Sequence, residues 1–169
     1  MKRRAQTLAF RGPVEHRHEA DDHLRAPGDA VVVRRGVDRS LTMLCPDGCG
    51  ETMTINLDRR AGPAWRLYVD GEVVSLYPSV WRNTGCGSHF IVWKSHIYWC
   101  DLGEELHSMD EEFVAQVLSN LRPTLQSYLD VAAELDVVPW AVLSACHQLK
   151  RQCLVREGST NQRGWFGSV

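Results

Sequence analysis

The hydrophobic pattern of the chain changes character at about Gly103. Before this point, apolar and polar residues alternate over short stretches, as in Glu51–Asp58, where every second residue is apolar. Short stretches of this kind, separated by turn residues, are typical of antiparallel strands. Further strands are expected at Ala30–Val33, Ser40–Cys45, Trp65–Val69, Glu72–Tyr77, His89–Trp93 and His96–Cys100.

Three of the turns between these strands have a recognisable chemistry. Asp70-Gly71 is a dipeptide that favours the type I′ turn of a two-residue hairpin. Lys94-Ser95 separates two apolar runs and predicts a second hairpin. The segment Cys45–Gly50 reads CPDGCG and predicts a tight loop between two strands.

After Gly103 the apolar residues recur with the period of helices. The run Ser108–Glu111 has the form of a capping box and predicts a helix over about Met109–Leu121. Pro123 suits the first turn of a second helix, and Pro139 that of a third. The third helix carries an apolar stripe made of Val142, Cys146, Leu149 and Cys153. This stripe assigns both of its cysteines to the core face of the helix.

These elements predict a single α+β domain with an antiparallel, zinc-ribbon-like β part followed by a C-terminal helical part. Its expected segments are a polar N-terminal extension (1–27), a zinc-binding β part (28–103), a helical part packed on it (104–157) and a tail (158–169).

The formal charge of −2 gives no electrostatic case for nucleic acid, which we do not expect as a partner. No apolar run approaches the ~20 residues that cross a bilayer, so no membrane association is expected. The first residues lack the apolar segment of a secretory signal, which indicates a cytoplasmic protein. In that reducing compartment, clustered cysteines more often bind a metal than form disulfides.

Four of the six cysteines lie beside glycines, turns or strand ends, where metal ligands are usually presented. Cys45 and Cys49 share one loop, Cys86 and His89 form a C-x2-H pair, and Cys100 ends a hairpin. These are five candidates for the four positions of a tetrahedral Zn²⁺ site. Either the four cysteines bind zinc and His89 is free, or His89 is a ligand and one cysteine is spare.

A histidine that does not bind the metal is a candidate acid or base. Ser79 is the better nucleophile to pair with His89, because Ser88 precedes His89 directly and points to the opposite face of the strand. Glu51 is a candidate base toward a zinc-bound water, if one coordination position stays open. The alternatives are a plain turn serine at Ser79 and a solvated strand residue at Glu51.

Five segments occur in an order that resembles a bacterial protein family of unknown function: LCPDGCGE, WRLY, SLYPSV, CGSHF and YWC. The family pattern has C-P-x-G-C-G, P-S followed by Ile or Val, C-x-S-H followed by an aromatic residue, and W-C. The resemblance covers about Ala30 to Asp101. This chain has Asp47 where many members carry another cysteine, which leaves the ligand set open.

The resemblance implies a companion of a bacterial ubiquitin-like conjugation system, with a ubiquitin-like protein and E1- and E2-like enzymes as partners. It marks seven residues of this chain: Cys45, Ser79, Cys49, Cys86, Ser88, His89 and Cys100. Two functions follow as expectations. The first is a zinc-binding adaptor that recognises the ubiquitin-like protein or its enzymes. The second is a hydrolase that processes the ubiquitin-like protein through Ser79 and His89, or through an open zinc site with Glu51.

Overall fold

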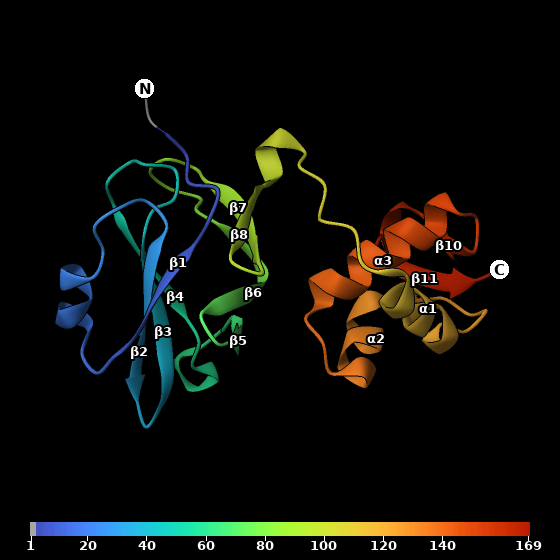
Figure 1. Ribbon diagram of the computed structural model, residues 1–169, viewed down its shortest axis with the longest axis horizontal. Helices are drawn as coiled ribbons and strands as arrows, with labels where there is room; N and C mark the ends of the chain where they lie inside the picture. Colours follow the sequence, from blue (N-terminus) through green and yellow to red (C-terminus); the bar gives the residue numbers. More distant parts are fainter. Residues whose placement is uncertain (1–2) are drawn as a thin grey trace. The chain divides into compact units, whose positions relative to one another are not determined.

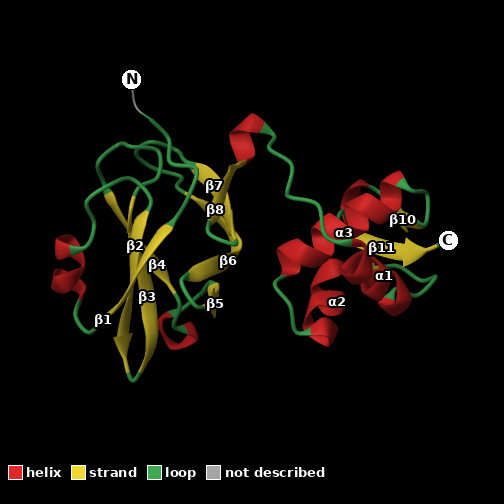
Figure 2. Ribbon diagram, viewed as in Figure 1, coloured by secondary structure: helices red, strands yellow, loops and turns green. Residues whose placement is uncertain are grey.

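A computed structural model describes residues 3–169 of the chain. The chain divides into two compact units, Met1–Glu104 and Glu105–Val169. Strands dominate the first unit, and helices with a small sheet make up the second (Figures 1 and 2). This order of antiparallel-rich sheets followed by helices confirms the predicted α+β class. No helix among residues 3–169 combines the length and the apolar character that a membrane span requires.

Two sheets form the first unit. One has the order β1-β2-β3-β4, with β1 parallel to β2 and the other pairs antiparallel. The other has the order β5-β6-β7-β8 and is antiparallel throughout. The strands are β1 (Ala9–Val14), β2 (Asp29–Arg35), β3 (Val37–Leu44), β4 (Thr52–Asn56), β5 (Arg66–Asp70), β6 (Val73–Trp81), β7 (His89–Trp93) and β8 (His96–Trp99). Short 3-10 helices follow β1, β4 and β8: η1 (Arg17–Asp22), η2 (Arg59–Ala61) and η3 (Cys100–Leu102).

The inner faces of both sheets contribute to one hydrophobic core. Leu41 and Met43 enter it from β3, and Leu76, Phe90 and Trp99 enter it from the second sheet, all fully buried. Burying a side chain of this size stabilises a fold by about 1.5–3 kcal/mol. The core therefore holds the loops that carry the predicted site on a rigid double layer.

One predicted hairpin turn forms where expected, and another is shifted by one residue. Lys94 and Ser95 have φ angles of 49° and 60°, the left-handed values of a type I′ hairpin between β7 and β8. Gly71 and Glu72 turn the chain between β5 and β6, one residue later than the predicted Asp70-Gly71.

The segment predicted to be a polar extension differs from that expectation, because it supplies the edge strand β1. Asp29, whose side chain is 3 % exposed, holds β1 in place through an ion pair with Arg11 at 2.7 Å. Burial opposes ionisation of this carboxyl, but hydrogen bonds from the Ala26 amide and Arg11 lower its pKa. The strand escaped the sequence pattern because Gly12 and Pro13 interrupt its alternation at a bulge.

The second unit consists of three helices and a sheet of order β10-β11-β9. Helix α2 and helix α3 are joined by the three-residue turn Asp136–Val138, and a hairpin follows α3. This order of elements and strands is that of a winged helix. Acidic residues outnumber basic ones in this unit. Its elements are α1 (Glu111–Asn120), β9 (Gln126–Ser127), α2 (Tyr128–Leu135), α3 (Pro139–Arg151), β10 (Val155–Glu157), η4 (Thr160–Gln162) and β11 (Trp165–Ser168).

Two helix starts differ from the prediction, and one agrees with it. Asp110, not Ser108, caps α1, because its carboxylate accepts a hydrogen bond from the amide of Phe113 at 2.8 Å. The prediction for Pro123 was wrong, since α2 begins at Tyr128 after the short strand β9. Pro139 occupies the first turn of α3 as predicted.

The tail and one cysteine also differ from expectation. The segment after Gly158 supplies strand β11, which pairs with β10, and Phe166 of β11 is fully buried in the core of the second unit. Cys146 lies in that core as predicted. Cys153 is exposed, because α3 ends at Arg151 and Cys153 takes a left-handed conformation beyond it.

Candidate functional site

Ser79 and His89 are in direct contact on adjacent strands. Ser79 lies near the end of β6, and His89 is the first residue of β7. The hydroxyl oxygen of Ser79 is 3.1 Å from Nε2 of His89, within hydrogen-bond distance. Both side chains are half-buried. This is the contact that a serine nucleophile and its general base require.

A bulge in β6 brings Ser79 to this position. Leu76 pairs with Val92 and Val80 pairs with Phe90, so β6 has two more residues than β7 between these pairs. Bulges re-aim side chains and are frequent beside active sites. The indole of Trp65 donates a hydrogen bond to the carbonyl of Ser79 at 3.2 Å and fixes the bulged backbone.

Trp81 lies on the same face as Ser79, two residues further along β6. It pairs directly with His89 across the sheet, and the two ring centroids are 5.8 Å apart. The side chain of Trp81 is nevertheless 69 % exposed. It therefore forms one wall beside the Ser79–His89 pair and presents a large apolar surface to solvent.

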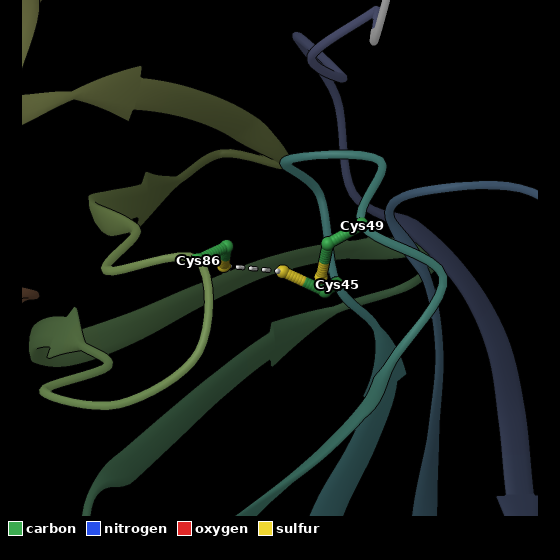
Figure 3. Close-up of side chains that lie close together, drawn as sticks. All are labelled: Cys45, Cys49 and Cys86. Carbon is green, nitrogen blue, oxygen red and sulfur yellow. Dashed lines mark hydrogen bonds between the residues drawn. The ribbon is translucent and has the colours of Figure 1, made fainter.

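Three of the predicted cysteines come together. The sulfur atoms of Cys45, Cys49 and Cys86 all lie within 4.8 Å of one another, and those of Cys45 and Cys86 are 3.6 Å apart. Figure 3 shows the sulfurs of Cys45 and Cys86 directed toward each other, with Cys49 beside Cys45. Cys45 and Cys49 belong to the β3–β4 loop, and Cys86 to the loop between β6 and β7. Three thiols converging from two loops are a suitable set for a metal ion.

Arg82 connects this group, which we call the cysteine cluster, to Glu51. Its Nη1 atom donates to the sulfurs of Cys49 at 3.6 Å and Cys86 at 3.4 Å. Its Nη2 atom forms an ion pair with Glu51, and this hydrogen bond raises the pKa of Arg82. Glu51 is thus a partner of the arginine that faces the thiols. The sequence offered one signal for Arg82, its place four residues before Cys86.

The thiols of the cluster differ in acidity. Burial raises the pKa of Cys45 to about 11. Burial also opposes ionisation of Cys86, but hydrogen bonds from the hydroxyl and amide of Ser88, together with the neighbouring thiols, lower its pKa to about 7. Ser88 is buried, with its hydroxyl 3.8 Å from Cys45, and so belongs to the cluster.

We expect this difference to appear in the alkylation of chelator-treated protein. A thiolate reacts with iodoacetamide and a thiol does not, so the rate at each cysteine rises with pH through its pKa. Cys86 should reach half its maximal rate at about pH 7, whereas Cys45, which is fully buried and has a raised pKa, should stay unlabelled at that pH. Mass spectrometry of the labelled peptides measures both profiles. Equal profiles for the two cysteines would contradict the described hydrogen bonding.

The fourth predicted cysteine, Cys100, is not a member of the cluster. It follows Trp99, which faces the core, and it begins the 3-10 helix η3. Burial raises the pKa of its thiol.

One member of the cysteine cluster, Cys86, belongs to the same hairpin as the Ser79–His89 pair. The β6–β7 loop closes where the amide of Arg82 donates to the carbonyl of Ser88 at 2.9 Å. Cys86 lies within this loop, and Ser79 and His89 lie on the strands that enter and leave it. An interaction that holds Cys86 against the β3–β4 loop therefore also restrains β6 and β7, the strands that carry Ser79 and His89.

Comparison with known proteins identifies the family. The family model for BubE, described as "Bacterial ubiquitination-like system serine protease", matches residues 16–100, about half of the chain. The matched range contains the cysteine cluster, Ser79 and His89. Searches of curated proteins and of solved structures found no match. The resemblance to proteins of bacterial ubiquitin-like conjugation systems is thereby confirmed, and the chain belongs to the BubE family.

Proposed function

We propose that this protein is a serine peptidase that uses Ser79 as nucleophile and His89 as general base. The single observation that carries the proposal is the 3.1 Å contact between the Ser79 hydroxyl and Nε2 of His89. The family description agrees with this chemistry. The sequence favoured the adaptor and offered the hydrolase as its alternative; the contact of Ser79 with His89 supports the hydrolase.

The reaction would proceed by acyl transfer. The Ser79 oxygen attacks the carbonyl carbon of the scissile bond while Nε2 of His89 accepts the hydroxyl proton. The resulting imidazolium returns this proton to the leaving amine, and the carbonyl remains as an ester on Ser79. Water then attacks the ester while His89 accepts one of its protons, and the imidazolium returns this proton to the departing Ser79 oxygen, which releases the carboxylic acid and restores the Ser79 hydroxyl.

We further propose that the cysteine cluster binds Zn²⁺. Three thiolates and one Zn²⁺ carry a net charge of −1, and the guanidinium of Arg82 lies against two of the sulfurs to compensate it. His89 is engaged with Ser79, which favours the alternative in which it is not a ligand. Cys100 is outside the cluster, so we assign three sulfur ligands and one nitrogen or oxygen ligand.

The zinc in this proposal has a structural role. With Cys45 and Cys49 on the β3–β4 loop and Cys86 on the β6–β7 loop, the thiols would hold the two loops together through the ion and so keep Ser79 beside His89. Glu51 would then act as a positioning residue, because its carboxylate holds Arg82 against the thiols. In the reducing cytoplasm these thiols stay available for metal. The ubiquitin-like protein of the same bacterial system is the proposed substrate.

A fluorophosphonate probe tests the nucleophile without requiring the natural substrate. We expect one modified residue, Ser79, in folded protein and none after denaturation, because only a serine activated by a base reacts at an appreciable rate. Peptide mapping by mass spectrometry locates the label. Modification of another serine, with Ser79 unlabelled, would contradict the proposal.

A further inference from the structure

The edge of β6 beside Ser79 has no partner strand. Strand β5 pairs with β6 only from Val73 to Tyr77, where Arg66 is its last partner residue. The chain leaves this line at Trp65, whose amide donates to Asn56. Among the described residues, no strand therefore continues the pairing along Pro78–Trp81 on the side away from β7.

Backbone groups at this edge point toward the unpaired side. In an antiparallel pair, hydrogen-bonded and non-bonded residue pairs alternate. The amide of Arg82 bonds to Ser88, so the neighbouring pair of Trp81 and His89 is a non-bonded one. The N–H and C=O of Trp81 consequently point away from β7. The Ser79 carbonyl has the same direction and is occupied by the indole of Trp65.

The exposed indole of Trp81 is a second, independent sign of a binding surface. Tryptophan, with tyrosine and arginine, is enriched among the residues that carry most of the binding energy of an interface. This indole stands beside His89 and at the same unpaired edge.

Resting on the proposed function, we propose that the substrate binds as an extended peptide segment that adds a strand to β6 along Pro78–Trp81. It runs antiparallel to β6, in line with β5, and one substrate residue exchanges both backbone hydrogen bonds with Trp81. The scissile carbonyl then lies beside the Ser79 hydroxyl, and a substrate side chain packs on the indole. The substrate class is thus an unfolded, strand-compatible tail, such as a flexible end of a ubiquitin-like protein, and not a folded surface.

The occupied carbonyl of Ser79 makes the expected hydrogen-bond pattern specific. The substrate residue that pairs with Trp81 donates its N–H to the Trp81 carbonyl. Its two sequence neighbours direct their N–H groups away from the edge, because a strand alternates. The residue that pairs with Ser79 finds its acceptor already used by Trp65. One substrate amide, and not every second one, should therefore be indispensable.

A series of synthetic peptides spanning the cleavage point, each methylated on one backbone nitrogen, tests this pattern. Methylation at one position should lower kcat/KM by about tenfold or more, the loss expected for a desolvated hydrogen bond. Methylation at its two neighbours should change kcat/KM by less than about threefold. Uniform tolerance, or losses at adjacent positions, would overturn the proposal.

The variant Trp81→Ala separates this proposal from the proposed function. We expect a higher KM for the peptide and a retained rate of Ser79 labelling by the small fluorophosphonate. Trp165→Ala, which removes an exposed tryptophan of the second unit, is the matched control and should leave both unchanged. Unchanged KM in Trp81→Ala with normal Ser79 labelling overturns only the strand-addition proposal. If the fluorophosphonate does not label Ser79 in the protein without substitutions, the proposed function itself is overturned.

Discussion

Ser79→Ala and His89→Ala should each abolish cleavage of a ubiquitin-like protein fused to a reporter, lowering kcat by about 10⁴-fold or more. Nucleophile and base act as one unit across the 3.1 Å contact, so removing either one removes the acyl-transfer route. For the same reason, the double variant should be no slower than the slower single variant. Time courses of fusion cleavage measure all three.

The control for these variants is Ser108→Ala, which removes an exposed hydroxyl from the second unit. It should cleave at the normal rate, and all variants should keep their circular dichroism and metal content. The rival mechanism is attack by a metal-bound water with Glu51 as base. Ser79→Ala at full activity, together with inactive but metal-replete Glu51→Gln, would replace the proposed dyad by that mechanism.

Much of the fold was predictable because its signals are local. The Lys94-Ser95 hairpin and the Pro139 helix start depend on a few neighbouring residues, whose turn and cap chemistry is readable in the sequence. Strand β1 pairs with β2 across η1, and β11 pairs with β9 from the other side of two helices, so both depend on pairing between distant segments. No local pattern reports such pairing, and the sequence therefore predicted an extension and a tail.

The same distinction explains the candidate site. The Cys45–Cys49 loop was predictable, because glycine and proline mark it as a turn that presents ligands. The contact of Ser79 with His89 depends on the bulge in β6, which shifts the register by two residues. Without that register, the sequence favoured a plain turn serine at Ser79 over a nucleophile. Cys100 was predicted to end a strand and point to the metal site. In the structure β8 ends at Trp99, and Cys100 begins the 3-10 helix η3.

Removal of the proposed zinc, by a chelator or by Cys45→Ser, should destabilise the first unit and slow the proposed cleavage together. Structural zinc contributes about 10–16 kcal/mol in small fingers. Here the sheets keep their own core, and the expected loss is about 3 kcal/mol, which lowers Tm by ~10–20 °C. Labelling of Ser79 should fall in parallel, because the freed β6–β7 loop no longer fixes His89. Calorimetry and metal analysis measure both effects.

Two matched substitutions test whether the effect belongs to the cluster. Cys153→Ser changes an exposed thiol and should alter neither metal content nor Tm. Cys146→Ala opens a cavity in the second unit and should keep the full metal content. X-ray absorption at the zinc edge should count three sulfur ligands. Four sulfurs would bring Cys100 into the site, and metal-replete Cys45→Ser with normal Tm would remove zinc from the cluster.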